Sequence, residues 1–283
     1  MWGTVGILYN KDMIPEPNQS WSILWDTQYQ KNVFMLDSYR DSMGITLKYL
    51  GYSMNSREVP ELMAAKDKLI EQKQSGVVKA YQVDETKDKM VAGEAALALM
   101  WSGDAQYAID LNDHLDYFVP SEGSNIWVDG AVILKSARNK ENAEKFINFL
   151  CRPDIALRNM DAIGYVSAVA TPEIMEAKRD TAIATRSDLS YFFGEGVGAD
   201  SLQINPVQYP DRKVVERCAM IRDFGNRTEL VLEMWSRVKG DNLNTGIVLL
   251  IFSVFGVLFV WLVYGKIRKY RQKQRRHRRR RRR

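Results

Sequence analysis

The sequence predicts an α/β protein with a mostly parallel sheet, followed by one membrane-spanning helix. Apolar segments of strand length alternate with segments of helical length through most of residues 2–240, a rhythm typical of βαβ units. A run of twenty uncharged residues, 245–264, then reaches about the length that a bilayer core requires. With 283 residues, of which 46% are hydrophobic, the chain is long enough for one or two buried cores.

Charge is divided unequally along the chain. Residues 266–283 contain 13 Lys and Arg and no acid, which leaves 27 basic against 35 acidic residues in 1–265, a balance of −8. The positive-inside rule places a basic tail that follows a membrane span in the cytoplasm and the acidic body outside. The tail has one aromatic residue, Tyr270, and so lacks the stacking platform of a single-strand binder. We therefore expect a membrane anchor at 245–264 with a cytoplasmic polybasic tail at 265–283, and no nucleic-acid partner.

The first half of the chain opens with a buried strand from Trp2 to Asn10. A brief strand over 33–36 runs into a helix that Asp37 or Ser38 caps, which places Asp41 in or near the first turn. Further elements are expected in this order: a helix over 59–74, a strand over 77–83, a helix over 85–93, a strand over 95–101 and a helix from Ser102.

The second half predicts a strand over 115–119 and, after a turn at 122–125, a strand that runs into the apolar residues 131–134. A helix over 139–151 follows, and Pro153 suits the first turn of the next helix. The pattern then weakens over 171–214, where the glycines of 194–198 indicate a loop. Helices are expected over 214–221 and 227–238.

Trp127 and Asp129 are the first candidate binding residues. Two positions apart on a strand, their side chains point to the same side. An ammonium group on an aliphatic stem gains from a carboxylate and from a π-face, so the pair suits an amine ligand. From these two residues alone, a Trp in the core and an Asp that caps a turn explain the pattern as well.

Histidine and cysteine usage argues against several kinds of site. The only histidines are His114 and His277, so a histidine-based metal site or a Ser-His-Asp triad is not expected. Cys151 and Cys218 fit no metal spacing. They are expected as two buried free thiols, with a disulfide as the alternative. We expect no cofactor.

Eight short motifs occur in the order seen in bacterial spermidine/putrescine-binding proteins, the extracytoplasmic solute receptors of polyamine ABC transporters. The chain over about 2–240 resembles this family through Trp2-Gly-Thr-Val-Gly-Ile-Leu-Tyr-Asn10, Asp37-Ser-Tyr-Arg-Asp41, Leu50-Gly-Tyr-Ser53, Gly93-Glu-Ala-Ala, Trp101-Ser-Gly-Asp-Ala105, Asn125-Ile-Trp-Val-Asp129, Phe146-Ile-Asn-Phe-Leu-Cys-Arg-Pro-Asp154 and Ile163-Gly-Tyr165.

The resemblance implies a two-lobed fold of the type II periplasmic-binding class that closes on its ligand by a hinge motion. It assigns 1–128 to the second lobe with the first crossing strand, 129–205 to part of the first lobe, and 206–240 to helices that return to the second lobe. Family members have roughly a hundred residues before the first crossing strand, so we expect an incomplete first lobe and either a fragment or a truncated gene product.

The resemblance also implies ligand contacts. Trp127 and Asp129 match an aromatic wall and an amine-binding carboxylate, Asp41 matches another acidic position, and Trp101 and Tyr165 match aromatic contacts. A further acidic position of some members aligns with Ser38 here, and Asp37 lies one residue away. The preference between spermidine and putrescine therefore stays open.

The predicted function is a non-catalytic polyamine receptor outside the cytoplasm that delivers its ligand to transporter permeases. Three alternatives remain: a receptor for another solute, such as an amino acid, iron or a thiamine derivative; a hydrolase that uses Asp37 and Asp41; and a truncated membrane-anchored protein without ligand. An anionic ligand would call for a pocket cation. Arg40 is the nearest candidate and is expected instead to pair with a carboxylate.

Overall fold

The computed structural model describes residues 1–240, 253–256, 261 and 264. Residues 1–235 form one compact unit and residues 236–283 a second. Most of the predicted membrane span at 245–264, and all of the tail at 265–283, lie outside the described residues. Within the described residues, no helix has the length and apolar character needed to cross a membrane.

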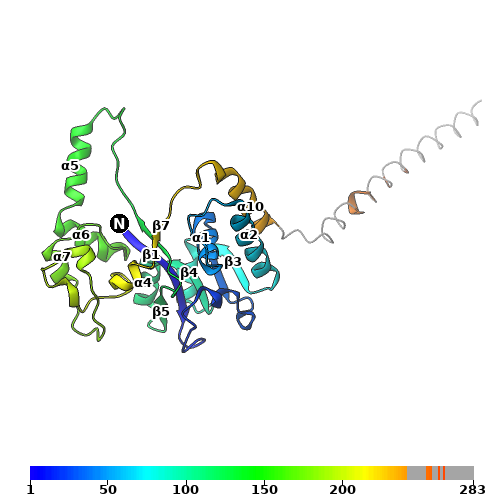
Figure 1. The fold of residues 1–283 in the computed structure, drawn as a ribbon, viewed down its shortest axis with the longest axis horizontal. Helices are drawn as coiled ribbons and strands as arrows, with labels where there is room; N and C mark the ends of the chain where they lie inside the picture. Colours follow the sequence, from blue (N-terminus) through cyan, green and yellow to red (C-terminus); the bar gives the residue numbers. More distant parts are fainter. Residues whose placement is uncertain (241–252, 257–260, 262–263, 265–283) are drawn as a thin grey trace, which may run out of the picture. The chain divides into compact units, whose positions relative to one another are not determined.

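Strands and helices alternate along much of the chain (Figure 1). The strands are β1 Trp2–Asn10, β2 Val33–Leu36, β3 Val78–Gln82, β4 Leu97–Trp101, β5 Leu115–Phe118, β6 Asn125–Val128 and β7 Ala219–Met220. The helices are α1 Tyr39–Tyr49, α2 Val59–Gln74, α3 Glu85–Val91, α4 Ser102–Leu111, α5 Lys140–Leu150, α6 Pro153–Ile163, α7 Pro172–Ala177, α8 Ser190–Phe193, α9 Arg212–Val215 and α10 Thr228–Gly240. The elements predicted up to residue 119 are confirmed within a few residues.

Seven strands form a mixed sheet in the order β3-β2-β4-β1-β6-β7, and β5 also pairs with β1. Strand β1 is antiparallel to β4, β5 and β6, whereas β2 is parallel to β3 and β4, and β6 is parallel to β7. The prediction of a mostly parallel sheet is therefore wrong. Side-chain periodicity shows that a segment is a strand, but it does not encode the direction of its partners.

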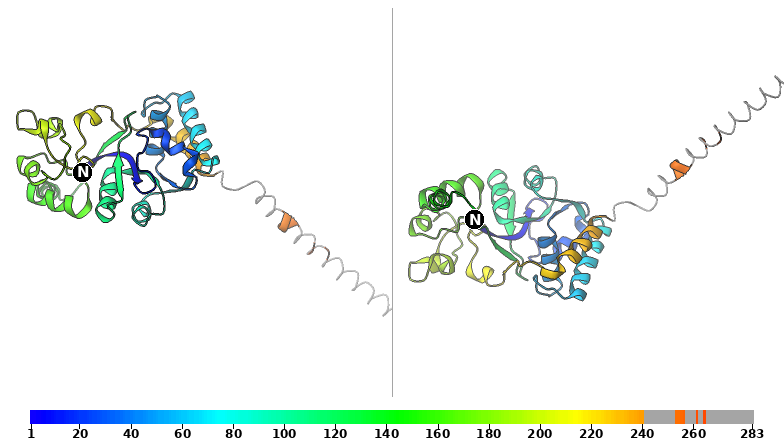
Figure 2. Two further views of the ribbon diagram at one scale, coloured as in Figure 1. Left: turned by 90° about the horizontal axis from the view of Figure 1, so that it is seen from below. Right: turned by 90° about the horizontal axis from the view of Figure 1, so that it is seen from above.

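Strand β1 joins two hydrophobic clusters and is buried along its whole length. It lies between α6 and α7 on one side and α1, α2 and β3 on the other (Figures 1 and 2). The Trp2 cluster contains Trp2, Met160, Val166, Ile174, Leu189 and Tyr209. The Leu8 cluster contains Leu8, Phe34, Ala98, Met100, Leu115 and Tyr117. Trp2 and Leu8 lie near opposite ends of the same face of β1, so each end of the strand contributes to one cluster.

Three predictions in the second half are wrong. Strand β6 ends at Val128, and residues 130–134 form no strand, with Val132 82% exposed. No strand among the described residues pairs with them, so an apolar sequence alone does not make a strand here. Residues 214–221 are not one helix, because the short α9 is followed by β7. Both cysteines are free, but Cys151 is exposed and Cys218 half-buried.

Candidate functional site

A cavity of about 510 Å³ lies where α1, β4, β6 and the segment after α6 meet. Its lining residues are Arg40, Asp41, Trp101, Asn125, Trp127, Val128, Asp129, Tyr165, Met220 and Ile221. They come from positions spread over most of the compact unit, so the cavity exists only in the folded chain.

Five of the seven predicted site residues meet in this cavity: Asp41, Trp101, Trp127, Asp129 and Tyr165. The other two, Asp37 and Ser38, are not among its lining residues. Ser38 is instead the N-cap of α1, and its hydroxyl accepts a hydrogen bond from the backbone N–H of Asp41.

Asp41 is a buried carboxylate, with 6% of its surface exposed. One carboxylate oxygen accepts a hydrogen bond from the Ser38 hydroxyl at 2.7 Å, and the other accepts one from the amide of Asn125 at 3.3 Å. Burial raises the pKa of Asp41, while these two hydrogen bonds, the nearby Arg40 and a hydrogen bond from the Trp101 side chain partly offset the rise. The cavity therefore contains a carboxylate whose ionised form a cationic ligand would stabilise.

Trp127 and Tyr165 form the aromatic part of the cavity, with ring centroids 5.5 Å apart and planes at 59°. Two glycines make room for these rings. A Cβ on Gly3 would lie 2.8 Å from the Trp127 ring, and a Cβ on Gly103 would lie 2.3 Å from the Tyr165 ring. Close packing against the backbone of β1 and of α4 thus fixes both rings.

Asp129 follows β6 directly and is exposed. Its backbone N–H donates to the carbonyl of Met1 at 2.7 Å, so the antiparallel pairing with β1 extends one residue past the end of β6. We call Trp127, Asp129 and Tyr165 the open trio, because the first and third are half-buried and the second is exposed. Asp41 and Asn125, which are 6% and 3% exposed, are the buried pair.

The structure adds pocket residues that the sequence did not single out as ligand contacts. Asn125, Val128, Met220 and Ile221 line the cavity, as does Arg40. Asn125 and Val128 flank the predicted Trp127, so their place on β6 was a signal. Met220 and Ile221 reach the cavity because β7 pairs with β6. The two strands are far apart in the sequence, so no local pattern indicates this pairing.

Arg40 stacks on the Phe224 ring, with 3.7 Å between the guanidinium carbon and the ring centroid. It donates a hydrogen bond to Asn55 at 3.2 Å, and it forms no ion pair within the described residues. The predicted pairing with a carboxylate is therefore wrong. Two of its nitrogens, Nε and Nη1, are buried without a hydrogen-bond partner among the described residues.

The described part of the chain contains no group of three or more His, Cys, Asp and Glu side chains that could hold a metal ion. The alternative of paired catalytic carboxylates also finds no support from the cavity. Asp41 lines it, but Asp37 does not.

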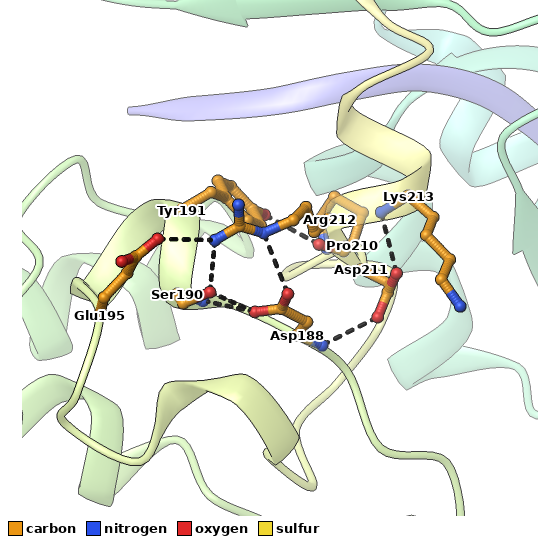
Figure 3. A network of polar contacts seen from close by, with 8 residues as sticks. All are labelled: Asp188, Ser190, Tyr191, Glu195, Pro210, Asp211, Arg212 and Lys213. Carbon is orange, nitrogen blue, oxygen red and sulfur yellow. Dashed lines mark hydrogen bonds and ion pairs between the residues drawn. The ribbon is translucent and has the colours of Figure 1, made fainter.

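A second polar network lies outside the cavity and ties residues 188–195 to residues 210–213 (Figure 3). Arg212 forms an ion pair with Asp188 at 3.0 Å. The Asp211 carboxylate accepts the backbone N–H of Asp188 at 2.8 Å, and the Tyr191 hydroxyl donates to the carbonyl of Pro210 at 2.8 Å. The charged and polar groups of this network bind one another, so we interpret it as a structural connection between the two segments.

Comparison with known proteins identifies similar receptors. The family described as bacterial extracellular solute-binding protein matches residues 2–185. The spermidine/putrescine-binding periplasmic protein of Salmonella typhimurium is 31% identical over 240 residues, which make up 84% of this chain and 62% of that protein. The chain thus spans less than two thirds of the length of this relative.

Solved structures of similar proteins include two from other bacteria. A putative spermidine/putrescine ABC transporter protein from Listeria monocytogenes superposes with a TM-score of 0.70 at 32% identity, covering 84% of this chain and 67% of that chain. The spermidine/putrescine ABC transporter substrate-binding protein PotD from Streptococcus pneumoniae superposes with a TM-score of 0.65 at 29% identity, with the same shares covered.

Proposed function

This chain belongs to the bacterial extracellular solute-binding protein family, and on that premise we propose that it binds a polyamine in the cavity between Asp41 and Asp129. Its similarity to spermidine/putrescine-binding proteins supports this choice of ligand. The role is that of a non-catalytic receptor, since ligand capture needs no reacting group.

The observation that carries the proposal is the chemistry of the cavity wall. Two carboxylates, two indoles and a phenol line one cavity of about 510 Å³. A polyamine alternates ammonium groups with methylene spacers. Carboxylates bind the ammonium groups through charge-assisted hydrogen bonds worth roughly 1.5–3 kcal/mol each. Aromatic faces cover the methylenes and add cation–π attraction of about 0.5–2 kcal/mol.

Calorimetric titration of the full chain with spermidine and with putrescine tests this function. We expect saturable binding in about the micromolar range or tighter, as a wall of several charge-assisted contacts allows. Titration with 1,4-butanediol, which has the spacer of putrescine without its charges, is the control and should give no binding. A folded protein that binds neither amine would rule out the proposed ligand.

A second candidate ligand class follows from Arg40. Because Nε and Nη1 of this pocket residue have no partner within the described residues, a ligand with a carboxylate beside its ammonium group, such as an amino acid, would satisfy them. A panel of amino acids decides between the classes. Tighter binding of an amino acid than of spermidine, lost in Arg40→Met, would favour the second class.

We also propose that the receptor delivers its ligand to the permease subunits of an ABC transporter, the context named for the similar Listeria and Streptococcus proteins. In this view residues 1–128 and 206–240 act as one lobe and residues 129–205 as part of the other, and the two close on the ligand. Small-angle scattering with and without spermidine measures such closure as a fall in radius of gyration, and an unchanged radius would contradict it.

Membrane attachment through residues 245–264, with a cytoplasmic tail at 265–283, stays a prediction from the sequence alone. A single apolar span would keep the receptor near its permease. Carbonate extraction of membranes from expressing cells tests it. The full chain should stay in the pellet, and a chain that ends at residue 240 should not. Release of the full chain would exclude an integral anchor.

A further inference from the structure

Asn125 occupies an unusual place for an amide. It lies on β6, is 3% exposed and lines the cavity. Its side-chain nitrogen donates to the Asp41 carboxylate at 3.3 Å, and its side-chain oxygen accepts the backbone N–H of Ile221 at 3.2 Å. A carboxylate only accepts and a backbone N–H only donates. The two partners therefore fix which way the amide points.

The amide of Asn125 is one of the groups that orient the Asp41 carboxylate. One oxygen receives a hydrogen bond from Ser38 at the start of the same helix, and the other receives one from Asn125 on β6. The Trp101 side chain at the end of β4 also hydrogen-bonds to the carboxylate, as the smallest of the contributions that lower its pKa. The hydrogen bond from Ser38 is local to α1, so it leaves the carboxylate free to rotate with the end of the helix. The hydrogen bond from Asn125 comes from 84 residues away and ties the carboxylate to the sheet.

The side-chain oxygen of Asn125 holds a second part of the cavity wall, the segment around Ile221. Met220 and Ile221 both line the cavity. Asn55 holds the same segment, because its amide donates to the carbonyl of Met220 at 2.9 Å and accepts the N–H of Arg222 at 2.8 Å. Two asparagines thus fix residues 220–222, and Asn125 is the one that also contacts the buried carboxylate.

We propose that Asn125 is a positioning residue of the ligand site, which orients the Asp41 carboxylate toward the ligand's ammonium group and couples it to residues 220–222. The inference rests on the proposed function for the identity of the ligand. Asn125 does not itself carry charge to the ligand. Its hydrogen bond favours the ionised form of Asp41 and orients the carboxylate toward the ligand. Its second hydrogen bond holds residues 220–222 at a fixed distance from Asp41.

Two substitutions test the two hydrogen bonds of the Asn125 side chain, the one to Asp41 and the one from Ile221. Asn125→Leu keeps the approximate size and removes both hydrogen bonds. Asn125→Asp keeps the acceptor for the Ile221 N–H and replaces the donor to Asp41 with a second carboxylate. Two facing carboxylates share a proton and titrate as a pair. The matched control is Ser124→Ala at the residue just before β6. It removes a buried hydrogen bond from the Ser124 hydroxyl to the carbonyl of Val5 at 2.6 Å.

The deciding measurement is a carbon-13 NMR titration of the aspartate carboxyl groups in the full chain, with Asp41→Asn used to assign the Asp41 signal. Both Asn125 variants should raise the pH at which Asp41 titrates, whereas Ser124→Ala should leave it unchanged. A carboxylate at position 125 would raise the pKa of Asp41 by like-charge repulsion alone. Asn125→Ala, which removes both hydrogen bonds and adds no charge, therefore answers the question if the Leu variant does not fold. An Asp41 titration that is unchanged in every folded Asn125 variant would overturn the proposal.

Binding gives a second readout. Calorimetry with spermidine in buffers of different ionisation enthalpy counts the protons released on binding. Because a cation favours the ionised carboxylate, both Asn125 variants should release more protons than the wild-type chain, and Asn125→Leu should bind about tenfold more weakly at pH 7, the loss of one charge-assisted hydrogen bond. Ser124→Ala should match the wild-type chain in proton release. If the wild-type chain binds no spermidine, the proposed ligand fails, and the NMR titration still decides the role of Asn125.

Discussion

The buried pair and the open trio face one cavity but are held in different ways. Asp41 and Asn125 are almost fully buried and hydrogen-bonded to each other. In the open trio, Asp129 is exposed, and the Trp127 indole N–H has no hydrogen-bond partner among the described residues. A carboxylate fixed before the ligand arrives loses little freedom on binding, whereas an exposed one must give up water and motion. The buried pair should therefore contribute more affinity than the open trio.

The largest expected effect is from Asp41→Asn. Removing the buried charge takes away a charge-assisted hydrogen bond worth about 2–3 kcal/mol, so spermidine affinity should fall by roughly 30- to 150-fold in calorimetry at pH 7. The melting temperature should stay level or rise, because burial raises the pKa of Asp41 and so opposes its ionised form. A loss of less than about fivefold would mean that the buried carboxylate is not a ligand contact.

A moderate effect is expected from Gly103→Ala. The added Cβ would lie 2.3 Å from the Tyr165 ring, so the ring must shift from its present place beside Trp127. Spermidine affinity should then fall about tenfold, the scale of one lost aromatic contact. Gly130→Ala is the control, since a Cβ there meets nothing within 4 Å. Equal affinity of the two variants would show that the Tyr165 ring does not contact the ligand.

Asp129→Asn should have a smaller effect than Asp41→Asn. Asp129 is exposed, and ion pairs between exposed groups are weak and screened by salt. We expect a loss of about fivefold in spermidine affinity at low ionic strength, which shrinks further at high salt. The test is calorimetry at two salt concentrations. A loss larger than that of Asp41→Asn would reverse the ranking of the buried pair and the open trio.

The smallest effect concerns stability and pH. The pKa of Asp41 is raised in the folded chain by burial, so its contribution to stability is fully present below the unfolded-state pKa and is lost as the pH rises through the folded-state pKa. The free energy of unfolding of the wild-type chain, relative to Asp41→Asn, should therefore decrease as the pH rises from about 4. Urea unfolding over a pH series measures this difference. A relative stability that increases with pH would contradict the burial argument.

Local signals explain most of what the sequence predicts correctly. Ser38 caps α1 and places Asp41 in its first turn, and Trp101 lies where β4 meets α4. These relations span a few residues. The resemblance, and not these local signals, predicted Asp41, Trp101 and Tyr165 as ligand contacts, a role that no periodicity would single out. That the five predicted site residues in the cavity wall bind a ligand stays a prediction, since a cavity shows where side chains meet and not what they bind.

The missed features depend on distant pairing. In the sequence, Asn125 is an ordinary polar residue of a strand. In the structure, its side chain hydrogen-bonds to Asp41 through the nitrogen and to Ile221 through the oxygen. Arg40 was expected to find a carboxylate and stacks on Phe224 instead, a contact that joins α1 to a segment more than 180 residues later. The apolar residues 131–134 satisfy every local rule for a strand and still lack a partner strand among the described residues.

Strand β1 has a consequence for how this protein tolerates change in length. Trp2 belongs to one hydrophobic cluster and Leu8 to the other, and Gly3 faces the Trp127 ring between them. Each residue adds about 3.3 Å and reverses the side to which the next side chain points. One residue inserted between Gly3 and Leu8 would turn every β1 side chain on one side of the insertion to the opposite face of the sheet. Trp2 and Leu8 could then no longer both point into their clusters. An insertion or deletion of a single residue in β1 should therefore disrupt both clusters, whereas surface loops generally tolerate changes in length.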